Sequence, residues 1–174
     1  MAVTLTGPIG TLLLKAKALV AASATMQTWL GVGDASAAEA LIGHFWQDAP
    51  TGGEEYGDGY PVVTVDIVDS IKYNMNAEGA GGNYQLHGTV VVSFIDVFPE
   101  KVKQDFDAGT QEVNEMADAF AMFANNLGQV VEELTLIAGT DTHLCVNNFG
   151  TMGPDLGDES EKPRVMIGAI FMEF

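Results

Sequence analysis

The residues best suited to catalysis or metal binding are His143 and Cys145, which lie two positions apart in the segment THLCVNNF. If that segment is a strand, both side chains share one face, where they could form a thiol–imidazole pair or bind a metal ion. Cys145 is the only cysteine, and His44 and His87 are far away in the sequence. An ordinary strand face with a buried thiol is therefore the simpler interpretation.

Four acidic residues crowd one segment near the C-terminus: Asp155, Asp158, Glu159 and Glu161. Carboxylates at this density could hold Ca²⁺, but their spacing is not that of an EF-hand loop, and we interpret them as a solvated charge run. The glycine-rich segments 31–36 and 79–83 lack the strand–turn–helix context of a phosphate-binding loop and are interpreted as turns. The sequence thus predicts no catalytic residue, no cofactor and no metal site, and we expect a protein that is not an enzyme.

Charge and length narrow the class of protein. The 174 residues include 24 acids and 7 bases, for a net charge of −17, and 47% of them are hydrophobic. Such a chain can bury a full core as one domain, but it repels phosphate, so specific nucleic-acid binding is not expected. Lys15 and Lys17 interrupt the apolar run 9–24, which argues against a signal peptide or a membrane span. We therefore expect a protein made in a cytoplasm and without membrane contact.

Helical patterns occur at the N-terminus and in the second half of the chain. Apolar residues at helical spacing predict a helix over 8–22, followed by a short helical turn over 25–30. Ser36 and Glu39 fit a capping box at the start of a third helix. The longest apolar stripe predicts a helix over 110–137, on the order of 40 Å long at 1.5 Å per residue.

Strand patterns alternate with these helices. Segments 61–68 and 84–98 alternate apolar and polar residues, as half-buried strands do, and predict a hairpin with a glycine-rich tip. Two further strands, 142–149 and 163–174, close the chain. The elements predict an α+β fold in which an antiparallel sheet of about four strands carries the long helix on one face, with N-terminal helices beside it. We expect a single domain, 1–174, with long loops near 49–60, 74–83 and 149–161.

The last strand, RVMIGAIFMEF, is apolar on both faces. One face holds Val165, Ile167, Ala169 and Phe171, and the other holds Met166, Ile170, Met172 and Phe174. A strand of this kind needs cover on both sides. The long helix can cover one side, and the other needs the first helix or another protein chain. We take Ile170, Met172 and Phe174 as a candidate interface between copies of the chain.

Three parts of the sequence resemble one family of virion proteins. The segment AASATMQTWLGVGDASAAEALI, the predicted strand ending TVVVSFIDV and the long helix ending VVEELTLIAG are similar to the tail-terminator and tail-completion proteins of long-tailed bacteriophages. The resemblance covers nearly the whole chain in its order of elements. It implies an α+β structural subunit that forms a ring, usually six-fold, in the virion. Such a ring terminates the tail tube and joins it to the head–tail connector.

The acid excess fits this family and one other class of function. DNA must slide through a tail without sticking, and a lumen of like charge prevents adsorption, so the four acids within 155–161 are candidate lumen residues. The alternative is an acidic protein that mimics DNA and inhibits a basic nucleic-acid-binding partner. A small enzyme that uses His143 and Cys145 is a third class.

Overall fold

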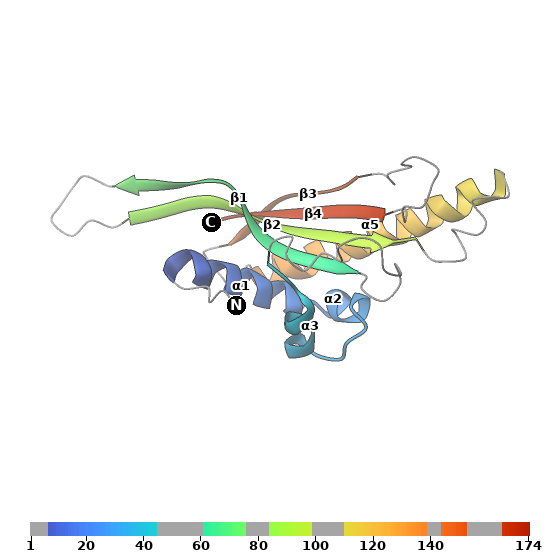
Figure 1. Cartoon of the computed structure of the whole chain (residues 1–174), viewed down its shortest axis with the longest axis horizontal. Helices are drawn as coiled ribbons and strands as arrows, with labels where there is room; N and C mark the ends of the chain where they lie inside the picture. The colour runs from blue at the N-terminus through green and yellow to red at the C-terminus, as the bar shows by residue number, and fades with distance from the viewer. Residues whose placement is uncertain (1–6, 45–60, 76–83, 99–109, 139–143, 153–164) are drawn as a thin grey trace, which may run out of the picture.

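Helices cover one side of an antiparallel sheet in the computed structural model, which describes residues 7–44, 61–75, 84–98, 110–138, 144–152 and 165–174 (Figure 1). The helices are α1 (Gly7–Ala22), α2 (Ala24–Trp29), α3 (Ala35–Leu41) and α5 (Thr110–Ala138). The strands are β1 (Val62–Met75), β2 (Tyr84–Val97), β3 (Cys145–Met152) and β4 (Val165–Glu173). The predicted α+β fold, with a long helix and N-terminal helices beside a four-stranded sheet, is confirmed.

The strand order in the sheet is β1-β2-β4-β3, and every neighbouring pair is antiparallel. Strands β1 and β2 form the predicted hairpin, and strands β3 and β4 form a second one. The two hairpins join through β2 and β4, which pair from Thr89 opposite Glu173 to Val97 opposite Val165. The strands that are central in space therefore come from distant parts of the sequence.

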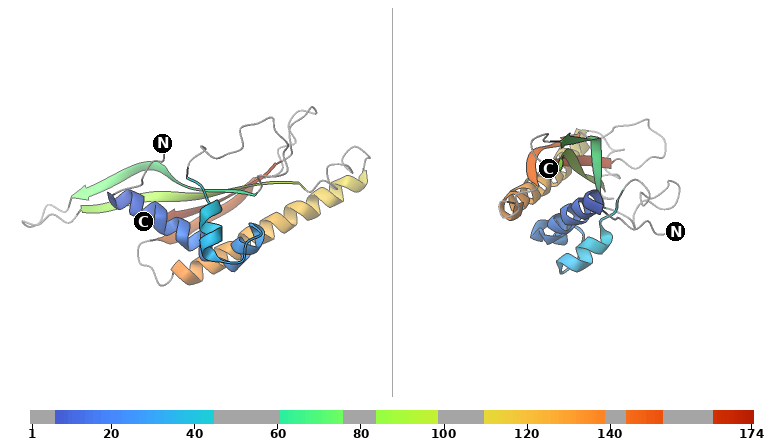
Figure 2. Two further views of the ribbon diagram at one scale, coloured as in Figure 1. Left: turned by 60° about the horizontal axis from the view of Figure 1, so that its bottom comes forward. Right: turned by 90° about the vertical axis from the view of Figure 1, so that its left-hand side faces the viewer.

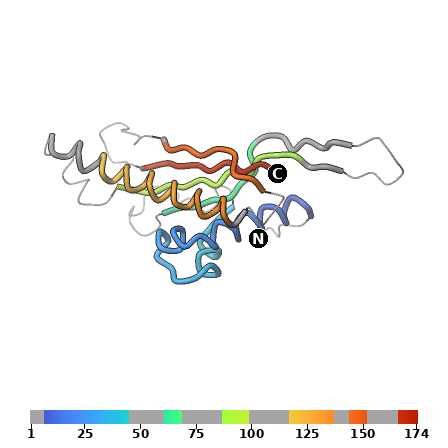
Figure 3. Tube along the Cα trace, turned by 180° about the vertical axis from the view of Figure 1, so that it is seen from behind, coloured from blue at the N-terminus to red at the C-terminus, as the bar shows by residue number. Residues whose placement is uncertain are grey.

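The sheet and the long helix share one apolar core. From α5 the core takes Ala119, Phe123, Leu127, Val130 and Leu134, which recur at helical spacing. From the strands it takes alternate residues, such as Val65, Val92 and Ile170, which lie opposite one another in register. Figure 3 shows α5 running along β4 and β3, and α1 completes the cover beside β1.

A glycine sets how closely α5 approaches the sheet. Gly168 lies on the helix-facing side of β4, and a Cβ atom there would be 3.0 Å from Leu127 Cδ2 and 3.2 Å from the Phe123 ring. Since few real Cβ contacts are that short, a side chain at position 168 would force the helix or its side chains to move. The close packing of α5 on β4 thus depends on Gly168.

The short helices begin where side chains accept hydrogen bonds from free amides. Ser23 caps α2, since its Oγ accepts from the Met26 amide at 3.0 Å. Asp34 caps α3, since its Oδ1 accepts from the Ala37 amide at 2.9 Å. The predicted capping box at Ser36 is wrong, because Asp34 is extended, with φ −155°, and the helix has already begun at Ala35.

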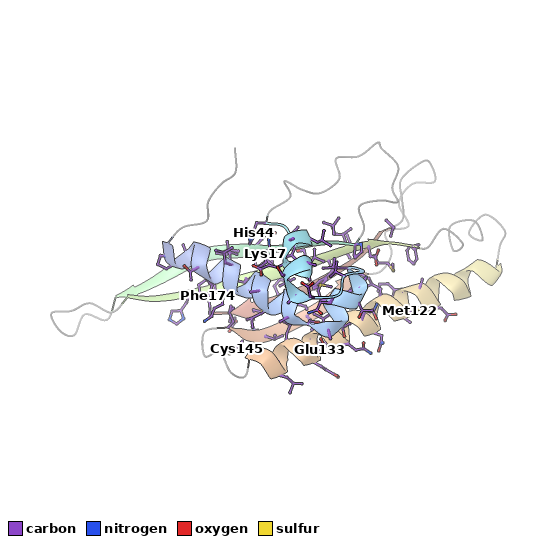
Figure 4. The ribbon with its side chains drawn as sticks, turned by 90° about the horizontal axis from the view of Figure 1, so that it is seen from below. Lys17, His44, Met122, Glu133, Cys145 and Phe174 are labelled. Carbon is purple, nitrogen blue, oxygen red and sulfur yellow. The ribbon has the colours of Figure 1, made fainter. Side chains whose placement is uncertain are left out.

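The carboxylate of Glu133, on α5, stabilises the N-terminal end of α2. Its carboxylate accepts from the Thr25 hydroxyl at 2.6 Å and from the Thr25 amide at 3.2 Å, and it lies beside α2 in Figure 4. The pKa of Glu133 is lowered, because these hydrogen bonds and others from Ser23 and Ala24 outweigh its desolvation. A carboxylate at a helix N-terminus also interacts favourably with the helix dipole.

Trp29 joins the helical layer to the sheet. Its ring stacks on Phe94 at 5.6 Å between centroids and meets Phe123 edge-on at 5.2 Å. Its indole Nε1 donates to Asp96 Oδ2 at 2.8 Å. Burial raises the pKa of Asp96, although this hydrogen bond and one from the Val97 amide act in the opposite direction. Trp29 therefore has a structural role in the core.

Candidate interaction surface

The two faces of β4 have different surroundings. On the helix-facing side, Met166, Ile170 and Met172 are buried, with exposed fractions of 3%, 0% and 0%. Their neighbours across the sheet are core residues of β2, since Ile170 lies opposite Val92. The predicted interface at Ile170 and Met172 is thus wrong for the folded subunit, because the helices of the same chain already cover both side chains.

Phe174, the third residue of that predicted interface, packs against the core from the end of β4. Its main chain exchanges two hydrogen bonds with Gly88, at 3.2 and 3.1 Å. A Cβ atom at Gly88 would lie 2.6 Å from the tip of the Phe174 ring, so the ring lies directly over the glycine. The half-buried Phe174 ring is therefore held by its own subunit (Figure 4).

The other side of the sheet, which we call the open face, carries the opposite alternation. Its β4 residues, Ile167, Ala169 and Phe171, are half-buried. No described helix lies over this face, and the end-on view of Figure 2 shows the helices gathered on the opposite side. The open face continues onto β2 and β1 through register partners of both kinds. The apolar ones are Val91, Ile95, Val97, Val62 and Val68, and the polar ones are Thr89, Ser93, Thr64 and Asp66.

Charge is sparse on the open face. Among its described side chains the ionisable groups are Asp66, His87, Glu173 and the thiol of Cys145, from the register of the strands. Asp66 is 8% exposed, and Glu173 lies at the end of β4, where it accepts a hydrogen bond from Asn147. A face with so few charges is unusual on a chain whose net charge is −17.

Strand β3 forms one border of the sheet and is also uncharged. Its sequence is CVNNFGTM, with no acid, base or proline. The side chains of Cys145 and Phe149 are exposed, Phe149 by 49%, as are the intervening Asn147 and Asn148. Figure 4 shows Cys145 at the rim of the molecule, near the last turns of α5. The outer side of this strand, which we call the β3 edge, has no pairing partner among the described residues.

The residues with predicted chemistry do not form a site in the described structure. Cys145 is exposed, which corrects the prediction of a buried thiol, and His143 lies outside the described residues. His44 Nδ1 is 2.9 Å from the Val65 carbonyl oxygen, and His87 is exposed on β2. Asp155, Asp158, Glu159 and Glu161 also lie outside the described residues.

The described side chains form no metal-binding cluster. No group of three or more histidine, cysteine, aspartate or glutamate side chains in that part of the chain could hold a metal ion. None of the described helices is long and apolar enough to cross a membrane.

Comparison with known proteins does not assign this chain to a family. A scan of protein-family models and a search of curated proteins found no match to this chain. The open face and the β3 edge are therefore the features from which a function can be argued. Sequence reasoning identified the apolar C-terminal strand but chose the wrong side of it, because alternation defines two faces without saying which one the helices cover.

Proposed function

We propose that this chain is a structural, non-enzymatic subunit of a tailed-phage virion that assembles into a homo-oligomeric ring at the head–tail junction. The observation that carries the proposal is the open face, where Ile167, Ala169 and Phe171 of β4 continue the apolar surface of β2. An apolar sheet face without a described covering element is typical of a surface that meets another protein.

Electrostatics favour this face for contact between copies. Two chains that each carry −17 repel one another wherever acids meet, and this repulsion is smallest where a surface holds few charges. On the open face the described acids are confined to Asp66, which is nearly buried, and Glu173 at the border. Burying apolar area contributes about 25 cal/mol per Å², and here little desolvation of charge offsets that gain.

The placement in a virion rests on the resemblance of the sequence to tail-terminator and tail-completion proteins. On that basis the ring terminates the tail tube, contacts the tube protein on one side and the head–tail connector on the other, and lies at the head-proximal end of the tail. Before assembly the subunit is in the host cytoplasm. The candidate lumen acids at 155, 158, 159 and 161 belong to this proposal.

The experiment that tests the ring is solution mass across a concentration series, by light scattering or mass photometry, with negative-stain imaging of large species. Six copies of the 18.4 kDa chain give a particle of about 110 kDa with a central hole. A chain that stays monomeric at all concentrations, and also fails to bind purified tails, contradicts the proposal.

The acid excess also supports a second candidate, a DNA mimic that inhibits a basic nucleic-acid-binding protein. Binding of this kind is electrostatic and weakens steeply with salt. Titration with a basic DNA-binding protein at about 50 and 200 mM salt separates the two candidates. A mimic binds tightly at low salt and loses most of its affinity at high salt, whereas ring contacts through the open face persist.

A further inference from the structure

Among the described side chains, one polar atom is buried and has no hydrogen-bond partner: Nε2 of His44. Buried polar groups are nearly always paired, so this exception needs a physical explanation. His44 follows α3 and lies at the outer edge of β1, where its Nδ1 is 2.9 Å from the Val65 carbonyl oxygen (Figure 4). A carbonyl oxygen only accepts, so Nδ1 carries the proton and Nε2 of the neutral ring carries none.

A short parallel bridge holds the same segment on β1. The Gly43 amide donates to the Val63 carbonyl at 2.9 Å, and the Val65 amide donates to the Gly43 carbonyl at 3.0 Å. The residue before the bridge, Ile42, is 1% exposed and belongs to the core. Because Ile42 makes the core contact, loss of the bridge does not require the core to open.

A second proton on the His44 ring turns Nε2 into a donor on a charged group. Histidine is the side chain that ordinarily changes charge between about pH 5 and 8. In the observed geometry this new donor is buried without an acceptor, and an unpaired buried donor on a charged group is costly. Once residues 43 and 44 leave β1, water can solvate the charged ring. Protonation therefore favours loss of the bridge.

Charged side chains on the neighbouring elements do not supply the missing acceptor. Helix α1 contacts both α3 and β1, and the charged side chains described on these three elements are Lys15, Lys17, Glu39 and Asp66. None of them forms a hydrogen bond with Nε2 of His44. Two are basic and two are acidic, so their electrostatic effects on the ring oppose one another.

We propose that His44 is a pH-sensitive switch: the neutral ring holds residues 43 and 44 on β1, and protonation of the ring releases them. The bridge is then complete at a pH above the range in which histidine titrates and is lost as the pH falls through that range. Its loss frees the main chain of Val63 and Val65 at this border of the sheet. The inference does not rest on the proposed ring, because every group in it belongs to one subunit.

Hydrogen exchange of single amides, measured by NMR on the full chain, tests the switch directly. Protection factors, which correct for the intrinsic pH dependence of exchange, are compared at about pH 8 and pH 5. We expect the protection of the Gly43 and Val65 amides to fall about tenfold at the lower pH. The Phe174 amide, which donates to the Gly88 carbonyl at 3.1 Å elsewhere in the sheet, should change less than about twofold.

A matched pair of variants identifies the titrating group. His44→Asn keeps a side-chain donor for the Val65 carbonyl but cannot become charged, so the bridge amides should stay protected at both pH values. His87→Asn makes the same change at an exposed histidine on β2 and should keep the wild-type loss of protection. Carboxylates titrate alike in all three proteins, so their effects cancel in the comparison. Thermal unfolding at pH 8 verifies that both variants are folded.

The outcomes separate the switch from the proposed function. If wild-type protection of the bridge is equal at both pH values, the charged ring is accommodated on β1 and the switch is overturned. An equal loss in wild type and His44→Asn also overturns it, because another group then causes the opening. Neither result bears on the ring, which is tested by solution mass, and a chain that stays monomeric leaves the switch intact.

Discussion

The two faces of β4 differ in how far their side chains are buried. Ile170 is completely buried on the helix-facing side, while Ile167, three residues earlier, is half-buried on the open face. Both are isoleucines in one regular ladder with β2. The difference lies in their cover, since α5 and α1 lie over one side and no described helix lies over the other.

This comparison separates residues that fold the subunit from residues available to a partner. A core side chain contributes through transfer from water and through packing, so its removal leaves a cavity. A half-buried surface side chain contributes less to folding and keeps part of its apolar area for association. Substitutions on the two faces should therefore affect different measurements.

The largest expected effect follows truncation of the buried isoleucine. Ile170→Ala should lower the free energy of unfolding by about 3 kcal/mol, because it removes three buried carbons and leaves a cavity. For a chain of this size that corresponds to a melting temperature lower by roughly 10 °C. Ile167→Ala is the control on the open face and should cost about 1 kcal/mol or less. Equal losses in thermal unfolding would contradict the distinction between the faces.

A smaller effect is expected where β4 meets α5. Gly168→Ala should cost about 1–2 kcal/mol in urea unfolding, because the new Cβ presses on Leu127 and Phe123. Gly150→Ala on the neighbouring strand is the matched control, since a Cβ atom there meets nothing within 4 Å. If both substitutions left the stability unchanged, that result would contradict the close packing of α5 on β4 at Gly168.

A weaker and pH-dependent effect is expected at Glu133. Its pKa is lowered in the folded chain, so its stabilisation is present above the ordinary glutamate pKa and is lost as the pH falls through the lowered value. Glu133→Gln should therefore destabilise the protein at pH 7, by less than about 1 kcal/mol because the group is largely solvated. The difference from wild type should shrink in unfolding measurements at acid pH. Glu132→Gln, at the exposed neighbour, removes the same charge from α5 and is the control.

The smallest effect on folding, but a clear one on assembly, is expected on the open face. Ile167→Thr keeps a β-branched side chain and should change stability by about 0.5 kcal/mol or less. It should weaken self-association several-fold in light scattering, because a hydroxyl replaces apolar contact area. Leu41→Thr on α3 replaces a more exposed apolar side chain, 56% exposed, away from this face and is the control. If the two variants assemble alike, the open face is not a contact surface between copies.

Local patterns predicted the elements well where one side of a segment is buried. The stripe over 110–137 was sufficient to define α5, and the alternation over 84–98 was sufficient to define β2. The stripe says less about which of its apolar residues face the sheet: Ala117 is exposed, whereas Phe123 is buried. Periodicity fixes a helix more reliably than its rotation against a sheet.

Local sequence patterns did not predict the contacts between residues that are far apart in the chain. Glu133 stabilises the start of α2 from 108 residues away, and Trp29 donates to Asp96 from 67 residues away. Each contact depends on how α2 packs against α5 and the sheet. The cap of α3 was missed for another reason, since Asp34 and Ser36 are both good caps and only the backbone conformation selects between them.

The sequence by itself determined the order of helices and strands, the acidic charge and the two apolar faces of the last strand, because these follow from residue types at fixed spacing. Only the tertiary structure decided that β4 lies between β2 and β3, that Ile170 is core and Ile167 is surface, and that β3 forms a border. The physical reason is that hydrophobic burial is non-directional. A sequence shows which side chains favour burial, and the packing of the whole chain determines which of them its own elements cover.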